Sequence, residues 1–186
     1  MSARHRIYLD SSVLVNYSFK KGNEQFSLLA MTLLNKVQIG LYEGVISTLC
    51  LMELMTSLRG LLTSHGVRDP QKWRSAIEEA FQAIFRVKNI VLVEGNPNER
   101  IGTDEIRDLF YSSIVWEAFE ILTKHPGKAG LDKENKLKHD GLSAPDVIHI
   151  ALAKRLACSE IASFDEDFLE SKGEIYALIL HKNSGW

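Results

Sequence analysis

Short apolar runs alternate along the chain with longer segments whose apolar residues recur at helical spacing. The runs predict five buried strands, at residues 7–9, 44–47, 90–93, 160–163 and 175–180. Helices are expected between them, at 11–19, 26–36, 48–63, from 70 onward, 103–124 and 143–157, with Pro70 and Thr103 suited to helix starts. This alternation indicates a parallel sheet with helices on both faces, a fold that gathers its sites at the carboxyl ends of the strands.

The length of 186 residues and the 45% hydrophobic content fit one domain over residues 1–186. A helical elaboration is expected within 67–142, and its polar, lysine-rich end at 125–142 predicts a long loop. No apolar run approaches the roughly 20 residues of a membrane span, and no signal peptide is seen, so a cytoplasmic protein is expected. Cys50 and Cys158 form no CxxC pair and are interpreted as buried thiols.

Carboxylates follow two of the predicted strands. Asp10 comes directly after the first strand, and Asp165 follows the fourth, with Asp167 two residues later. Each has a simpler interpretation: Asp10 could cap the next helix, and Asp165-Glu166-Asp167 could be a solvated acidic turn. The alternatives stay open for each residue taken alone.

Two further carboxylates fall on predicted helices. Glu53 lies in a segment that is apolar nearly all round, where a bare charge is costly unless it is paired or bound to a cation. A solvent strip beside Thr56 and Ser57 is the alternative. Asp146 stands three residues after Ser143, which is a capping pattern, although capping and metal binding are compatible.

Together these acids suit a hard divalent cation such as Mg²⁺. The six histidines, including His125, His139 and His149, lack metal-ligand spacing, so solvated or structural roles are expected for them. Setting the four acids aside leaves 22 basic against 20 acidic side chains, which is compatible with a polyanionic substrate. The cations considered for contact with a phosphate backbone are Lys20, Lys21, Arg59, Lys154 and Arg155.

Four motifs in order along 7–180 resemble the PIN-domain family and, within it, the VapC-type toxin ribonucleases. They are Leu9-Asp10-Ser11-Ser12, the segment 46–54 that carries Glu53, the segment 146–153 that begins at Asp146, and Ser163-Phe164-Asp165-Glu166-Asp167-Phe168. Ser163 stands where the family often has threonine, and 67–142 is longer than in the smallest toxins. The resemblance implies a three-layer α/β/α sandwich around a five-stranded parallel sheet, with the acids lining one pocket.

The same resemblance implies a metal-dependent endoribonuclease that hydrolyses phosphodiesters in single-stranded or structured RNA. Its expected catalytic residues are Asp10, Glu53, Asp146 and Asp165, and these with Asp167 would bind Mg²⁺ or Mn²⁺. The partners it implies are RNA, a protein antitoxin and a second copy in a homodimer. A catalytically silent module that binds RNA or protein is the rival; a phosphatase with Asp10 as nucleophile fits less well, because Ser12 stands where that chemistry usually has a second aspartate.

Overall fold

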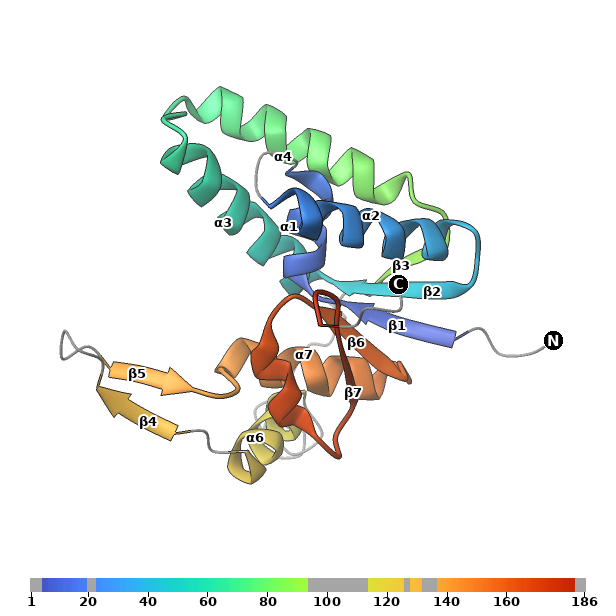
Figure 1. Ribbon diagram of the computed structural model, residues 1–186, viewed down its shortest axis with the longest axis vertical. Coiled ribbons are helices and arrows are strands. Elements are labelled where there is room, and N and C mark those ends of the chain that lie inside the picture. The colour runs from blue at the N-terminus through green and yellow to red at the C-terminus, as the bar shows by residue number, and fades with distance from the viewer. Residues whose placement is uncertain (1–4, 20–22, 94–113, 126–127, 132–136, 183–186) are drawn as a thin grey trace, which may run out of the picture.

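A five-stranded parallel sheet forms the centre of the protein (Figure 1). The structure is a computed structural model that describes residues 5–19, 23–93, 114–125, 128–131 and 137–182. The strands are β1 (His5–Leu9), β2 (Tyr42–Ser47), β3 (Ile90–Val93), β6 (Glu160–Ser163) and β7 (Tyr176–Ile179). They lie in the order β3-β2-β1-β6-β7, and each adjacent pair is parallel. The predicted parallel sheet of five strands is thereby confirmed.

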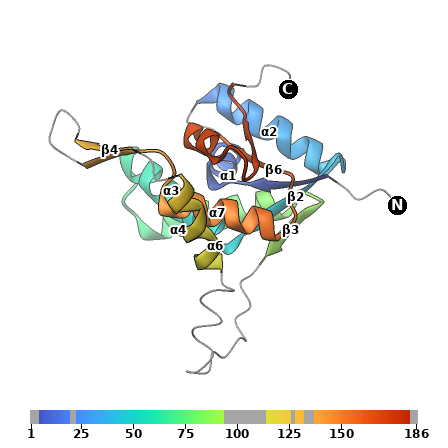
Figure 2. The same ribbon diagram turned by 90° about the horizontal axis from the view of Figure 1, so that it is seen from below.

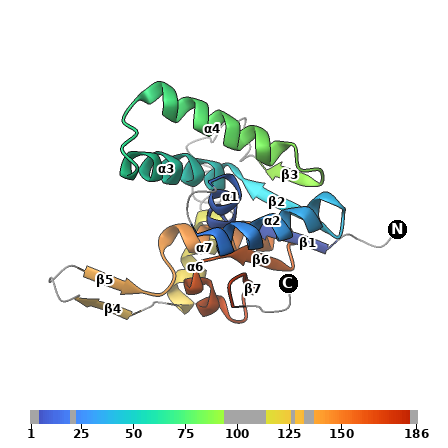
Figure 3. The ribbon, with the colours of Figure 1, turned by 45° about the horizontal axis from the view of Figure 1, so that its top comes forward.

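Helices cover both faces of this sheet (Figures 1 and 2). The helices are α1 (Ser11–Ser18), α2 (Glu24–Gln38), α3 (Thr48–Ser64), α4 (Pro70–Phe85), α6 (Ile114–Lys124) and α7 (Ala144–Arg155), followed by a 3₁₀ helix, η1 (Glu166–Ser171). Helices α6 and α7 pack together on one side and α2 lies on the other, while α3 and α4 form an antiparallel pair (Figure 3). Within the described parts of the chain, no helix is both long and apolar enough to cross a membrane.

The central strand β1 brings its following residue to the carboxyl edge of the sheet. Ile7, Tyr8 and Leu9 are all fully buried, because β1 is flanked by β2 and β6 and covered on both faces. The chain then leaves the sheet through a polar helix cap, as it also does after β2 and β6. The caps are Asp10 for α1, Ser47 for α3 and Asp165 for η1. Polar side chains therefore gather at one edge of the sheet.

The prediction of a loop over 125–142 is wrong in part. Two short strands, β4 (Lys128–Leu131) and β5 (Leu137–Asp140), pair there as an antiparallel hairpin that projects from the body near α7 (Figure 1). The many lysines and glycines of this segment carry little hydrophobic pattern, so its strands are hard to recognise from the sequence. Of the helix expected at 103–124, the structure describes only α6; Thr103 and the rest lie outside the described residues. That residues 1–186 form a single domain stays a prediction.

Candidate active site

Asp10 lies at the carboxyl end of β1 and is only 5% exposed. Its backbone N–H donates to Ala162 of β6, which fixes the turn into α1. One carboxylate oxygen, Oδ2, accepts hydrogen bonds from the backbone N–H and hydroxyl of Ser12, at 3.2 and 2.6 Å, and from the Ser163 hydroxyl, at 2.8 Å. The other oxygen, Oδ1, lies 3.9 Å from Nε2 of His149. Asp10 thus caps α1 with one oxygen and presents the other to the site.

Glu53 extends from α3 toward the same point. Its side chain is half-buried, and Oε2 lies 2.9 Å from Nε2 of His149. Burial acts to raise the pKa of Glu53, but the hydrogen bond and charge of His149, together with a hydrogen bond from Ser11, outweigh burial and lower it. Glu53 is therefore a paired, ionised carboxylate rather than a free charge on the strip beside Thr56 and Ser57.

His149 is the site residue that sequence reasoning missed. It lies on α7, is 1% exposed, and faces both carboxylates, so it is not a solvated histidine. Burial acts to lower its pKa, but hydrogen bonds to Cys50 and Glu53 and the charge of Asp10 raise the pKa to about 10. A signal was present: a lone imidazole in the apolar run Val147-Ile148-His149-Ile150 is expected to be buried with a partner.

A buried polar network holds the opposite side of the His149 ring. Nδ1 lies 2.9 Å from the Tyr8 hydroxyl, which lies 2.7 Å from the hydroxyl of Ser47. The Sγ of Cys50 lies 3.3 Å from the same Tyr8 oxygen, and burial, acting with Cys50, raises the pKa of Tyr8. Cys50 is free and buried, as predicted. Side chains from β1, the end of β2 and α3 therefore fix the orientation of His149.

Asp146 begins α7 and belongs to a capping box. Its Oδ2 accepts the backbone N–H of Ser143 at 2.6 Å, while the Ser143 hydroxyl accepts the backbone N–H of Asp146 at 3.4 Å. Burial raises the pKa of Asp146 despite these bonds, and the charges of Asp165 and Asp10 raise it further. Like charges disfavour the ionised form of a carboxylate, so Asp165 and Asp10 shift the pKa of Asp146 in the same direction as burial.

Asp165 and Asp167 lie at the more exposed rim of this region. The backbone N–H of Asp165 donates to the Ser163 hydroxyl at 2.9 Å, so Ser163 links the turn to Asp10. Asp165 caps η1 by accepting the backbone N–H of Asp167 at 2.9 Å. The acidic turn is therefore a real cap, placed next to the buried carboxylates.

The donor set fits a divalent cation. Among the described residues, one group of acids and histidines has ligand atoms that all lie within 4.8 Å of one another: Asp10, Glu53 and His149. Asp146, Asp165 and Asp167 lie outside this group. Two carboxylates and an imidazole are ligands that divalent metal ions accept. Roles for all five predicted acids in catalysis or metal binding stay predictions.

We expect the Asp146→Asn variant to lose the RNA cleavage predicted from the sequence without losing stability. Its raised pKa means that the ionised carboxylate disfavours the folded state at neutral pH, and this cost fades as pH falls below the pKa of the folded state. The amide keeps an acceptor for Ser143, so the metal-free variant should melt at or above the wild-type temperature. Cleavage should fall by about 10- to 100-fold.

Ser143→Ala is the matched control, because it removes the cap hydroxyl and keeps the carboxylate. It should cost about 1 kcal/mol of stability and leave cleavage of the folded protein near normal. RNA cleavage rates and melting curves are measured on the same preparations. If Asp146→Asn cleaves RNA at the wild-type rate, Asp146 serves only as a helix cap.

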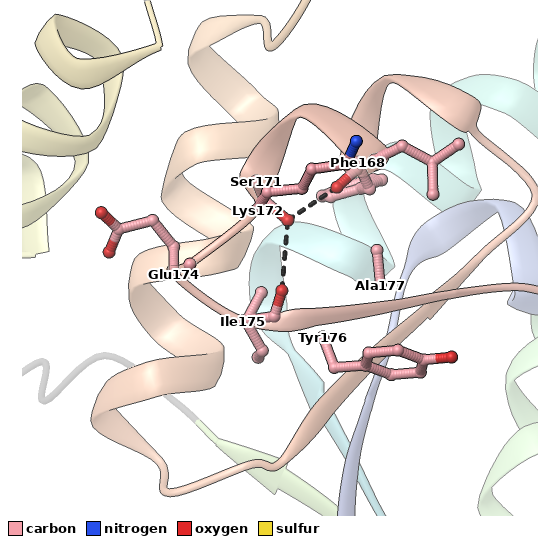
Figure 4. Close-up of a pocket in the computed structure, with 9 residues that line it drawn as sticks. Phe168, Ser171, Lys172, Glu174, Ile175, Tyr176 and Ala177 are labelled. Carbon is pink, nitrogen blue, oxygen red and sulfur yellow. Dashed lines mark hydrogen bonds between the residues drawn. The ribbon is translucent and has the colours of Figure 1, made fainter.

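A cavity of about 480 Å³ lies apart from these carboxylates, between η1 and β7 (Figure 4). Its lining includes Phe168, Ile175, Tyr176 and Ala177, and the Ser171 hydroxyl beside it donates to the carbonyl oxygen of Phe168. None of the five predicted site residues lines it. The group of potential metal ligands found among the described residues lies instead at the carboxyl edge of the sheet, so the chemistry is better sought there.

Known structures share this fold. VapC20 of Mycobacterium tuberculosis, described as a sarcin–ricin loop cleaving toxin, superposes with a TM-score of 0.51 at 16% identity, over 89% of this chain and 95% of that chain. VapBC2 of Rickettsia felis, bound to a DNA fragment from its promoter, gives a TM-score of 0.53 at 10% identity, over 92% of this chain and 96% of that chain. At these identities the likeness shows the fold alone, the α/β/α sandwich.

Among curated proteins, none matches the sequence. The model of the PIN domain family, in contrast, matches residues 7–173, from the strand that leads into Asp10 to the turn after η1. The matched region contains all five acids discussed above together with His149. This chain therefore belongs to the PIN domain family.

Proposed function

We propose that this protein is a metal-dependent endoribonuclease, which hydrolyses phosphodiester bonds in single-stranded or structured RNA in the cytoplasm. The observation that carries the proposal is the convergence of Asp10, Glu53 and His149 at the carboxyl edge of the sheet, in a chain of the PIN domain family. The choice of RNA over DNA is supported by the sarcin–ricin loop cleaving activity named for VapC20. The residue chemistry alone does not distinguish the two.

The chain's own residues would prepare the site for a phosphodiester. A bound Mg²⁺ or Mn²⁺ would neutralise the substrate and lower the pKa of a water. Asp10 and Glu53 would hold the ion, with Asp146, Asp165 and Asp167 at its periphery. Ser12 and Ser163 keep Asp10 oriented through its second oxygen, which limits the rearrangement needed on binding. Burial raises the pKa of Asp146, and the charges of Asp165 and Asp10 add to this, so its ionised form is the one that a bound cation would favour.

Several of the cations considered for contact with RNA are already engaged. Lys154 pairs with Glu174, which also pairs with Lys124, and Arg155 pairs with Glu117 at 2.6 Å. Arg59 is exposed on α3, the helix that carries Glu53, and is the better candidate for a phosphate contact. Lys20 and Lys21 lie outside the described residues.

We expect the tag-free protein to cleave mixed RNA with Mn²⁺ or Mg²⁺ and to lose cleavage in excess EDTA. Clustered carboxylates repel a phosphodiester unless a cation reverses the local field. Gel analysis of the RNA, with readdition of Mn²⁺ after EDTA, measures this. Equal cleavage in EDTA would rule out the metal mechanism. Complete absence of turnover with every divalent ion would favour the rival, a catalytically silent module that binds RNA or protein.

A protein antitoxin and a homodimer are part of the same proposal. The support is the shared fold with VapC20, named as a toxin, and with VapBC2. Under this proposal the chain is the toxin of a toxin–antitoxin pair, and its partner restrains RNA cleavage in the cell. An open reading frame beside its own that encodes such a partner would support the pairing.

A further inference from the structure

We propose that Nε2 of His149 is a direct metal ligand, which makes this site prefer a first-row transition ion such as Mn²⁺ to Mg²⁺. The inference rests on the proposed metal-dependent function and adds one ligand and a class of ion to it. Mg²⁺ takes oxygen ligands and keeps much of its water, whereas imidazole is a common ligand of transition ions. A nitrogen donor facing two carboxylates therefore discriminates between the two kinds of ion.

The distances from Nε2 of His149 to the two carboxylates suit donors to one ion, and all three ligand atoms lie within 4.8 Å of one another. Two donors about 2.1 Å from an octahedral ion lie about 3 Å apart when adjacent and about 4.2 Å apart when opposite. Nε2 of His149 lies 2.9 Å from Oε2 of Glu53 and 3.9 Å from Oδ1 of Asp10, so both separations fall within that range. Glu53 is also the more exposed of the two carboxylates, which gives an ion a way in from solvent.

The far side of the ring has the support that a ligating histidine requires. Such histidines donate their other ring N–H to a fixed acceptor, which holds the ring in place. In the tautomer with the proton on Nδ1, His149 donates to the Tyr8 hydroxyl, and Tyr8 donates to Ser47. When Nε2 coordinates an ion, its own proton leaves to solvent, and the proton on Nδ1 stays with this buried acceptor.

The competing role for His149 is to position Glu53 through an Nε2–H hydrogen bond and to touch no metal. In that role a protonated imidazole would pair with the carboxylates without an ion. Here Nε2 faces both carboxylates, and α7 carries His149 three residues after Asp146, so one helix brings both residues to the site. The two roles differ in one measurable respect, which is a bond between nitrogen and the ion.

Pulsed electron paramagnetic resonance of Mn²⁺ bound to the tag-free protein tests that bond directly. We expect a nitrogen hyperfine coupling in the wild-type protein, and its conversion to the ¹⁵N pattern when the protein is labelled with ¹⁵N-histidine. Asp10→Asn, which removes a carboxylate ligand, should lose the bound Mn²⁺ and so place the signal at this site. These measurements need no substitution of His149, and they stand even if variants of this buried residue fail to fold.

His149→Gln should abolish the nitrogen coupling and weaken Mn²⁺ binding by about 10- to 100-fold, while changing Mg²⁺ affinity much less. Glutamine can still donate to Glu53, so a purely positioning role would be largely rescued by this variant. His65→Gln is the control, because His65 caps the same helix α3 about 18 Å beyond Glu53. It should leave the coupling and both affinities unchanged.

Mn²⁺ bound in an Asp10-dependent way without nitrogen coupling would overturn the inference and leave His149 as a positioning residue. The same conclusion would follow if His149→Gln bound Mn²⁺ as tightly as the wild type. RNA is absent from these measurements, so the two proposals fail separately. If nitrogen coupling is seen but RNA is not cleaved, the proposed function is wrong and His149 is still a metal ligand. If RNA is cleaved but no nitrogen coupling is seen, the proposed function stands and His149 is not a ligand.

Discussion

An Asp10→Asn protein is expected to cleave RNA at least about 1,000-fold more slowly than the wild type, since metal-based stabilisation of several kcal/mol would be lost. The protein should remain folded. Asparagine is as good a helix cap as aspartate, and its carbonyl oxygen can accept the hydrogen bonds that Ser12 and Ser163 donate. What it loses is the charge that faces His149 and Glu53. Initial cleavage rates and melting curves of the same preparations measure both effects.

Asp69→Asn is the matched control for Asp10. Asp69 also caps a helix, α4, and accepts a backbone N–H at 2.9 Å, but it is exposed and lies outside the ligand group found among the described residues. The control should cleave at the wild-type rate. If Asp10→Asn also cleaves RNA at the wild-type rate, Asp10 serves only as a helix cap.

The toxin proposal adds a cellular measurement to the same pair. Expression of the wild-type chain without a partner should slow growth, while expression of Asp10→Asn at the same level should not. Slow growth with both forms, or with neither, would count against a toxin whose effect depends on this site.

Glu53→Gln is expected to cause the second largest loss, with a distinct effect on stability. The lowered pKa of Glu53 means that its ionised form stabilises the folded state at neutral pH, and this contribution is lost as pH falls through the lowered pKa. Glutamine keeps an acceptor for His149 but not the charge. We expect the metal-free variant to lose about 1 kcal/mol, or about 3 °C in melting temperature, at neutral pH. The difference should vanish in acid.

The gain in melting temperature on adding Mn²⁺ should also shrink in Glu53→Gln, because stabilisation by a ligand follows its affinity for the folded state. Cleavage should fall by about 100-fold or more, on the scale of losing a metal ligand. Glu78→Gln makes the same change in an exposed i,i+4 pair with Arg74 on α4 and should alter none of these quantities. If Mn²⁺ raises the melting temperature of Glu53→Gln as much as that of the wild type, and RNA cleavage is near normal, Glu53 is not a metal ligand.

The sheet and its helices could be predicted because their signals are local. The apolar run from Ile7 to Leu9 favours burial, and these residues are buried. Asp10 directly after it is both a helix cap and a strand-end carboxylate, and both roles depend only on neighbouring residues. The same holds for Ser143 and Asp146, whose capping box lies within four consecutive residues. The hairpin of β4 and β5 was missed because its residues carry no alternating hydrophobic pattern.

Contacts between distant residues were decided only by the tertiary structure. Glu53 and His149 are 96 residues apart, and no pattern near either one announces the other. Lys154 and Arg155 resemble free cations in the sequence, yet packing of α7 brings Glu174 and Glu117 to them. The sequence by itself determined the five strands of the main sheet and the carboxylates that follow β1 and β6, because burial and capping act between near neighbours. The tertiary fold decided that Asp10, Glu53 and His149 meet. Parallel pairing brings the ends of β1 and β2, which lead into Asp10 and α3, to one edge, and α7 carries His149 to Glu53 there.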